Sequence, residues 1–269
     1  MSGQMNIHPT AVVSEEALLH ESVLVGAFSV IEEGVKIGPG TTVATHVRIS
    51  GPTIIGENNT IDSFAALGGA PQDIGYSGDP TELHIGDENL IREYVSIHRG
   101  TVKGGGKTVI GNGCMVMAYA HIGHDCIIED HVIIVNAAHL SGHTEVGVRA
   151  TVGGLTGTHQ FSRIGTFAFI GGGSAVSKDV PPYAMVTGER GQMRISGLNK
   201  VGLRRNGMDR KTIAKIDAAY RILFHSPELL HEQALDKVEQ ELGECLEVSE
   251  LLAFIRNSKR GVVKRVKKS

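Results

Sequence analysis

Aliphatic residues recur every six positions through the first two thirds of the chain. From Ile7 to Leu67, all eleven positions at a spacing of six are aliphatic residues. The step returns over 85–97 and, after a change of phase, over 110–176, so that Thr158 is the one polar residue among 26 positions. This period fits neither an amphipathic helix nor a simple alternating strand. It is typical of a prism of short parallel strands, in which each hexad turns one aliphatic side chain inward.

Three hexads make one coil of 18 residues, so the 26 positions predict about nine coils, stacked at the ordinary strand spacing of about 4.8 Å. The 35 glycines supply small residues for the corners of such a prism. We therefore expect an all-β hexapeptide-repeat parallel β-helix, coiled left-handed as in known hexapeptide examples. Residues 18 positions apart should lie above one another on the same side.

The repeat also predicts how the chain is divided. We expect the β-helix over 1–180, with two polar, glycine-rich loops projecting from it at 68–84 and 98–109. A connector over 181–207 should lead to a small C-terminal helical domain over 208–269, where apolar residues change to helical spacing.

The C-terminal part should contain three helices, over 208–224, from Ser226, and over 249–258. A serine followed by a proline is a common way to begin the second of these.

Charge is unevenly distributed along the chain. Residues 1–198 contain 11 Lys and Arg against 19 Asp and Glu, whereas 199–269 contain 15 against 10. The basic end fits a solvated face or a dock for an acidic partner protein better than an arm that binds nucleic acid.

The cysteines and the apolar runs bear on where the protein works. The three cysteines have no paired spacing, which favours a reducing compartment. No apolar run reaches 18 residues and no segment resembles a signal peptide. We expect a cytoplasmic protein without membrane insertion.

Histidines gather in the middle of the repeat, beginning with the stretch A-H-I-G-H-D-C at 120–126. With 18 residues per coil, these side chains form one vertical stripe. The stacked pairs are His121 with His139, His124 with Gly142, and Asp125 with His143.

His124 is the strongest candidate for a catalytic group. The glycine stacked on it leaves free space and an accessible backbone N–H beside the imidazole. An imidazole next to a carboxylate and facing a free amide suits a general base with an oxyanion donor. Asp125 could orient His124 only if the backbone turns a corner there, because neighbours in a strand point to opposite sides.

A metal site is the alternative use of clustered histidines. His121 and His139 have the right spacing for two ligands on one side of a β-helix, with a third from a neighbouring subunit. No carboxylate or cysteine completes the pair, and the HExxH motif is absent. We therefore predict catalysis without a metal.

Further motifs point to a particular protein family. They are I-H-R-G-T at 97–101, G-G-G at 104–106, S-G-H at 141–143, T-H-Q-F at 158–161, D-V-P-P-Y at 179–183 and G-L-R-R-N-G at 202–207. Together with A-H-I-G-H-D-C, they make the chain resemble the bacterial UDP-N-acetylglucosamine O-acyltransferase family almost from end to end. Those enzymes perform the first step of lipid A synthesis.

The resemblance implies an enzyme that moves a 3-hydroxyacyl chain from acyl carrier protein to the 3-hydroxyl of UDP-N-acetylglucosamine. The phosphopantetheine arm arrives with the donor, so no other cofactor is expected. The acidic carrier would fit the basic C-terminal part, and the family forms homotrimers with active sites between subunits.

The resemblance also assigns roles to residues. His124 would be the base, Asp125 its support, and the Gly142 N–H the oxyanion donor. Gly172 and Arg190 lie where the family measures its acyl chain, and glycine at 172 favours a chain of about fourteen carbons. The expected substrate contacts are Asp73, His121, His143, His159, Gln160, Asn199 and Arg205.

Two positions depart from the family pattern. Gly75 stands where a lysine is usual, and Val201 where a glutamate is usual. These changes leave open an N-acyltransferase that acts on a UDP-linked 3-amino sugar. A β-helical scaffold without activity is the non-enzyme alternative, although a scaffold has no need of a histidine stripe facing glycine.

Overall fold

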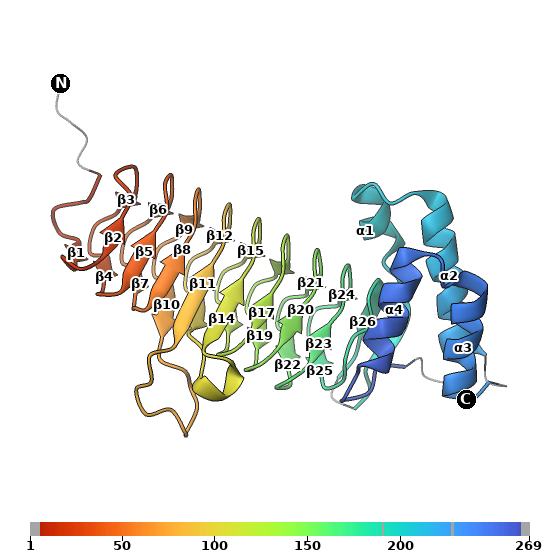
Figure 1. The fold of residues 1–269 in the computed structure, drawn as a ribbon. Helices are drawn as coiled ribbons and strands as arrows, with labels where there is room; N and C mark the ends of the chain where they lie inside the picture. The colour runs from red at the N-terminus through yellow and green to blue at the C-terminus, as the bar shows by residue number, and fades with distance from the viewer. Residues whose placement is uncertain (1–5, 190, 227–228, 265–269) are drawn as a thin grey trace.

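The computed structural model describes residues 6–189, 191–226 and 229–264. Short strands stack as successive rungs of a long prism, and the helices lie together at its C-terminal end (Figure 1). None of the described helices is long and apolar enough to cross a membrane.

Three sheets form the sides of the prism. The first sheet contains β1 (Val12–Val13), β4 (Val30–Ile31), β7 (Arg48–Ile49), β10 (Ala66–Gly69), β13 (Ser96–His98), β16 (His121–Ile122), β19 (His139–Leu140), β22 (Gly157–Thr158) and β25 (Ala175–Val176). The second contains β2 (Leu18–Leu19), β5 (Val35–Ile37), β8 (Thr53–Ile55), β11 (Glu82–Ile85), β14 (Lys107–Ile110), β17 (Ile127–Ile128), β20 (Glu145–Val146) and β23 (Arg163–Ile164).

The third sheet contains β3 (Leu24–Val25), β6 (Thr42–Val43), β9 (Thr60–Ile61), β12 (Leu90–Ile91), β15 (Met115–Val116), β18 (Ile133–Ile134), β21 (Thr151–Val152), β24 (Phe169–Ile170), β26 (Ala184–Thr187) and β27 (Arg194–Leu198). All these strands pair in parallel except β26 with β27, which are antiparallel.

The predicted 18-residue register is confirmed in the coils that carry no loop. Ile122 pairs with Leu140, and Val152 pairs with Ile170. Of the 26 hexad positions, 23 are buried, and all of these except Thr158 form one continuous aliphatic core. The exceptions are Ile7, Val13 and Leu19, which lie at the N-terminal end of the prism, where fewer coils cover them. The hexapeptide β-helix is therefore confirmed.

The chain turns its corners through residues with a left-handed backbone. Along one edge of the prism, Asp125, His143 and Phe161 follow one another at intervals of 18, with φ of 60°, 60° and 63°. Each lies three positions after an inward hexad residue. A non-glycine residue in this conformation is uncommon, so its repetition shows that coil closure imposes it.

The two loops are shorter than predicted. The segment 68–84 was expected to be entirely loop, but β10 continues to Gly69 and β11 begins at Glu82. In β11, Leu83 and Ile85 are buried between less buried polar residues, which is the alternation of a strand with one solvent-facing side. The loop 70–81 lengthens its coil, because Leu67 pairs with Ile97, 30 positions on.

The second loop occupies 99–106 and contains a short 3₁₀ helix, η1 (Val102–Gly104). Its coil is also lengthened, since Leu83 pairs with Thr108, 25 positions on. Both loops leave the first sheet, after β10 and β13, and project on the same side of the prism (Figure 1). Each insertion therefore preserves the pairing of the coils around it.

The C-terminal part contains α1 (Lys200–Arg205), α2 (Arg210–His225), α3 (His231–Leu242) and α4 (Leu246–Arg256). The segment 181–207, predicted as a connector, holds β26, β27 and α1; the boundary drawn there stays a prediction. The helix expected from Ser226 begins at His231 instead, because Ser226 is the C-cap residue of α2. Pro227 lies outside the described residues.

Buried polar contacts attach this part to the prism. Asp179, just after the last regular coil, is 1% exposed and accepts hydrogen bonds from the Arg163 N–H and the Ser258 hydroxyl. The Tyr183 hydroxyl donates to Glu250 at 2.5 Å, and burial raises the pKa of this tyrosine. The helices are therefore fixed to the C-terminal end of the β-helix.

Candidate active site

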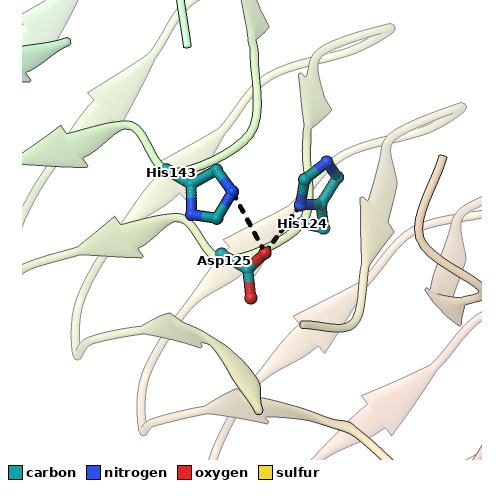
Figure 2. Close-up of side chains that lie close together, drawn as sticks. All are labelled: His124, Asp125 and His143. Carbon is teal, nitrogen blue, oxygen red and sulfur yellow. Dashed lines mark hydrogen bonds and ion pairs between the residues drawn. The ribbon is translucent and has the colours of Figure 1, made fainter. Parts of the chain in front are cut away.

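His124 and Asp125 lie at the corner that follows β16, and their side chains meet (Figure 2). The left-handed backbone of Asp125 turns its carboxylate toward the preceding residue, which a straight strand would not allow. The Asp125 Oδ2 lies 2.7 Å from the His124 Nδ1. When Nδ1–H donates to this carboxylate, Nε2 is left as the proton acceptor. The corner on which the sequence prediction depended is present.

The Asp125 carboxylate has further partners and is completely buried. Oδ1 accepts from the Thr101 N–H at 2.7 Å, and Oδ2 accepts from the Thr101 hydroxyl at 2.7 Å. The Nε2 of His143 lies 3.5 Å from Oδ2 (Figure 2). A buried carboxylate needs such donors to offset its loss of water. Asp125 therefore orients His124 and at the same time holds the loop 99–106.

Gly142 lies directly against the His124 ring. A Cβ at this position would be 2.6 Å from Cε1 and 2.7 Å from Nε2, so any side chain would displace the imidazole. Within the described residues, the Gly142 N–H donates no hydrogen bond. A free amide beside Nε2 is the arrangement that an oxyanion donor requires.

A cavity of about 230 Å³ opens in front of these groups on the outer side of the first sheet. The sequence predictions of His121 and Gln160 as site residues are consistent with their positions in its wall. Its lining residues are Gln72, His98, His121, Gly123, His124, His139, Leu140, Ser141, Gly142 and Gln160.

Three histidines of the site, His98, His121 and His143, are poor cations. Burial, together with the neighbouring rings of His98, His139 and His124, lowers the pKa of His121 to about 4. Burial also lowers the pKa of His98 and of His143. At neutral pH these rings are therefore neutral groups that each offer one donor and one acceptor to a ligand.

The same geometry bears on the metal alternative. Ligand atoms of His124, Asp125 and His143 lie within 4.8 Å of one another, so these residues, rather than the predicted pair His121 and His139, are the metal-like group among the described residues. Both carboxylate oxygens of Asp125 already accept hydrogen bonds from Thr101. A metal here would compete with the contacts that hold the loop and orient the base.

The other expected site residues fall into two groups. Asp73, in the first loop, lies near enough to His143 to act on its charge, and the His143 ring stacks on Phe161 at 4.2 Å. His159 is exposed beside the cavity residue Gln160, whose carbonyl contacts its Nδ1 at 3.0 Å. These residues gather around the dyad.

Asn199 and Arg205 are not brought to the cavity. The Asn199 side chain caps α1, accepting from the Gly202 N–H and donating to the Phe167 carbonyl. Arg205 is exposed at the end of α1, and no described residue of α1 lines the cavity.

Gly172 and Arg190 are the two residues expected to set the length of the acyl chain. Gly172 lies at the corner after β24, where a Cβ would be 3.1 Å from the Gly154 carbonyl oxygen. Space is open above Gly157 on the neighbouring first sheet, one coil beyond His139. Arg190 lies outside the described residues.

Sequence reasoning missed the side chains that hold the residue before Gly142. The Thr158 hydroxyl accepts from the Ser141 N–H at 3.0 Å and lies 2.9 Å from the Thr144 hydroxyl, which in turn donates to the Ser141 carbonyl at 2.7 Å. These two buried threonines fix the residue before Gly142. The signal was present in the sequence, because Thr158 is the one polar residue in the aliphatic series.

Comparisons with known proteins agree along the whole chain. A family model described as UDP N-acetylglucosamine O-acyltransferase, domain 2, matches residues 179–263, and a model of bacterial transferase hexapeptides matches 16–51 and 107–142. The acyl-[acyl-carrier-protein]--UDP-N-acetylglucosamine O-acyltransferases of Halorhodospira halophila and Myxococcus xanthus are 48% and 46% identical, each over 96% of this chain and 99% of their own length.

Solved structures give the same result. The UDP-N-acetylglucosamine O-acyltransferase of Moraxella catarrhalis superimposes with a TM-score of 0.93 at 40% identity, covering 97% of this chain and all of its own. The UDP-N-acetylglucosamine acyltransferase of Arabidopsis superimposes with a TM-score of 0.83 at 38% identity, covering 96% of this chain and all of its own.

Replacing Thr158 by valine keeps the side-chain shape but removes the acceptor of the half-buried Ser141 N–H. We expect Thr158→Val to lose about 1–3 kcal/mol of unfolding free energy, the cost of an unsatisfied buried group. Urea unfolding followed by circular dichroism measures the change. Thr60→Val, on an exposed strand position, is the control and should stay within about 0.5 kcal/mol of the parent. Equal midpoints for both variants would contradict this account of Thr158.

Proposed function

The chain belongs to the UDP-N-acetylglucosamine O-acyltransferase family, and we propose that it moves a 3-hydroxyacyl chain from acyl carrier protein to the 3-hydroxyl of UDP-N-acetylglucosamine. This is the acyl transfer that begins lipid A synthesis. The observation that carries the proposal is the buried Asp125 carboxylate 2.7 Å from the His124 Nδ1, with the free amide of Gly142 packed against the same ring.

The chemistry follows from these three groups. The His124 Nε2 takes the proton of the sugar 3-hydroxyl as its oxygen attacks the thioester carbonyl carbon of the donor. The Gly142 N–H donates to the carbonyl oxygen while it carries negative charge. When the C–S bond breaks, the sulfur leaves as a thiolate and His124 returns the proton to it. The Asp125 carboxylate stabilises the imidazolium that exists between the two transfers.

Neutral histidines around the cavity fit a polyhydroxylated acceptor. His121 and His143 present uncharged rings that can donate to and accept from sugar hydroxyls, and His159 and Gln160 add further polar groups. A 3-amino sugar stays the alternative acceptor, because residue 75 is glycine and the exposed Val201 carries no charge. Both sugars belong in the first assay. A scaffold without activity gives no reason for the buried dyad.

The donor would reach the site on acyl carrier protein. Exposed basic residues follow one another along α1 and α2, which suits the acidic surface of such a carrier and needs no nucleic acid. They include Arg204, Arg205, Arg210, Lys211 and Lys215. The phosphopantetheine arm of the carrier is part of this substrate. The last five residues of the basic tail lie outside the described residues.

We propose a homotrimer in which neighbouring subunits share each active site. Asn199 and Arg205 lie away from the cavity of their own chain, so a second copy has to supply them if they bind the nucleotide. Ile74, at the tip of the first loop, is fully exposed, which suits a loop that reaches a neighbouring subunit.

The cysteines support a cytoplasmic location. All three are free and buried, and burial raises the pKa of Cys114 to about 11 and that of Cys126 to about 12. Such thiols are inert and suit a reducing compartment.

Removing the imidazole tests the catalytic assignment. His124→Ala should lower kcat by roughly 10²–10⁴-fold, because a positioned general base contributes that much. Single-turnover transfer from a labelled 3-hydroxyacyl carrier to UDP-N-acetylglucosamine, and separately to its 3-amino analogue, measures it. The exposed His8→Ala is the control and should match the wild type. If His124→Ala kept more than about a tenth of the wild-type kcat, the assignment would be wrong.

Mixing two inactive variants tests the shared site. His124→Ala and Arg205→Ala should each lose activity, but trimers assembled from equal amounts of both should regain up to about a quarter of the wild-type sites. The reason is that a subunit with an intact His124 then meets a neighbour with an intact Arg205. If the mixture is no more active than its parents, or if light scattering shows a fully active monomer, the shared site is wrong.

The acyl chain length can be tested at Gly172. With no side chain there, the groove should favour about fourteen carbons, and Gly172→Met should shift the preference toward about ten. Each buried CH₂ contributes about 0.8 kcal/mol, so two carbons should change selectivity tenfold or more. Competition between carriers of different chain length measures the ratio, with the distant, exposed Leu18→Met as control. A wild type that already prefers ten carbons would show that another residue sets the length.

A further inference from the structure

A lysine from the second loop occupies the space that residue 75 leaves empty. A Cβ built on Gly75 would lie 2.6 Å from the Lys103 Nζ and 3.1 Å from the Asp73 Oδ1. The Lys103 Nζ itself lies 4.0 Å from the Asp73 Oδ1. The two loops therefore meet through an ammonium and a carboxylate, and glycine at 75 is what makes room for the ammonium.

The backbone that carries Lys103 is tied directly to the catalytic dyad. Thr101, at the start of η1, donates twice to the Asp125 carboxylate and accepts from the Gly104 N–H. Gly104 packs so closely on this carboxylate that a Cβ would lie 2.0 Å from the Asp125 Cγ. Lys103 sits between these two anchored residues. Its side chain is 74% exposed, so the ammonium is open to a ligand.

We propose that Lys103 and Asp73 together bind the hydroxyl groups of the acceptor sugar, with Lys103 donating and Asp73 accepting. The proposal rests on the proposed function, because it takes UDP-N-acetylglucosamine as the acceptor. A carboxylate 4.0 Å from the ammonium disfavours a diphosphate in the same place, since two like charges would be brought together. A sugar hydroxyl suffers no such repulsion and uses both the donor and the acceptor.

The position of Asp73 fits this role. Burial lowers the pKa of His143, whereas the charge of Asp125 and, more weakly, that of Asp73 act to raise it, so Asp73 acts on a ring that is expected to contact the sugar. The charge that residue 75 lacks is thus supplied from a different loop. The acceptor end of the site keeps a cation although the first loop has none at that position.

Replacing the ammonium by an apolar chain of similar length tests the proposal. Lys103→Met should raise the KM for UDP-N-acetylglucosamine about tenfold, the loss of one charge-assisted hydrogen bond, and leave kcat within about twofold. Binding of UDP alone, measured by calorimetry, should not change. Lys36→Met, an exposed lysine on β5, is the matched control and should alter neither value.

Moving the lysine from the second loop to the first is the decisive experiment. In the double variant Gly75→Lys, Lys103→Met, the amine returns from the first loop, and KM should recover to within about threefold of the wild type. The proposal is overturned if Lys103→Met leaves KM within twofold, if it weakens UDP equally, or if the double variant is no better than Lys103→Met. A wild type that acylates only the 3-amino sugar refutes the proposed acceptor, and the same variants then test Lys103 on that sugar. A wild type that neither binds nor acylates either nucleotide overturns both proposals.

Discussion

Hydrogen bonding between successive coils is the interaction on which every other feature depends. Because each strand pairs with the matching strand of the next coil, 18 residues on wherever no loop intervenes, residues remote in sequence become vertical neighbours, and the aliphatic core and the histidine stripe both follow from that pairing. A one-residue slip would turn the buried hexad side chains outward. The register is therefore maintained by the same burial that stabilises the core, and the site inherits its geometry from it.

Asp125 joins three roles in one buried side chain. Its left-handed backbone closes a coil, its carboxylate orients His124, and its two contacts with Thr101 anchor the second loop. Such a carboxylate is expensive to bury, and the donors around it offset that cost. The imidazole of His124 is therefore an integral part of the prism. Its orientation and the placement of Lys103 depend on the same two oxygen atoms.

Periodicity predicted most of the fold and part of the site. The hexads fixed the core, and 18-residue stacking placed His124 against Gly142 and Asp125 against His143, as the structure has them. The limits of the loops escaped prediction, because Glu82 and His84 are polar yet belong to a strand. The predicted start of α3 was wrong, because a serine followed by a proline also suits the end of a helix. The contact of Lys103 with Asp73 joins two loops, and no period relates residues in loops.

The insertions at 70–81 and 99–106 have a consequence for how such an enzyme diversifies. Each insertion lengthens one coil while the strands on either side keep their partners. Loops of different lengths can therefore be attached to the same prism. Sequence drift at loop positions that make no contact with the prism leaves the prism unaffected. A lineage can therefore exchange which loop contributes a given charge, losing a lysine at one place and gaining it at another, without passing through an unfolded ancestor.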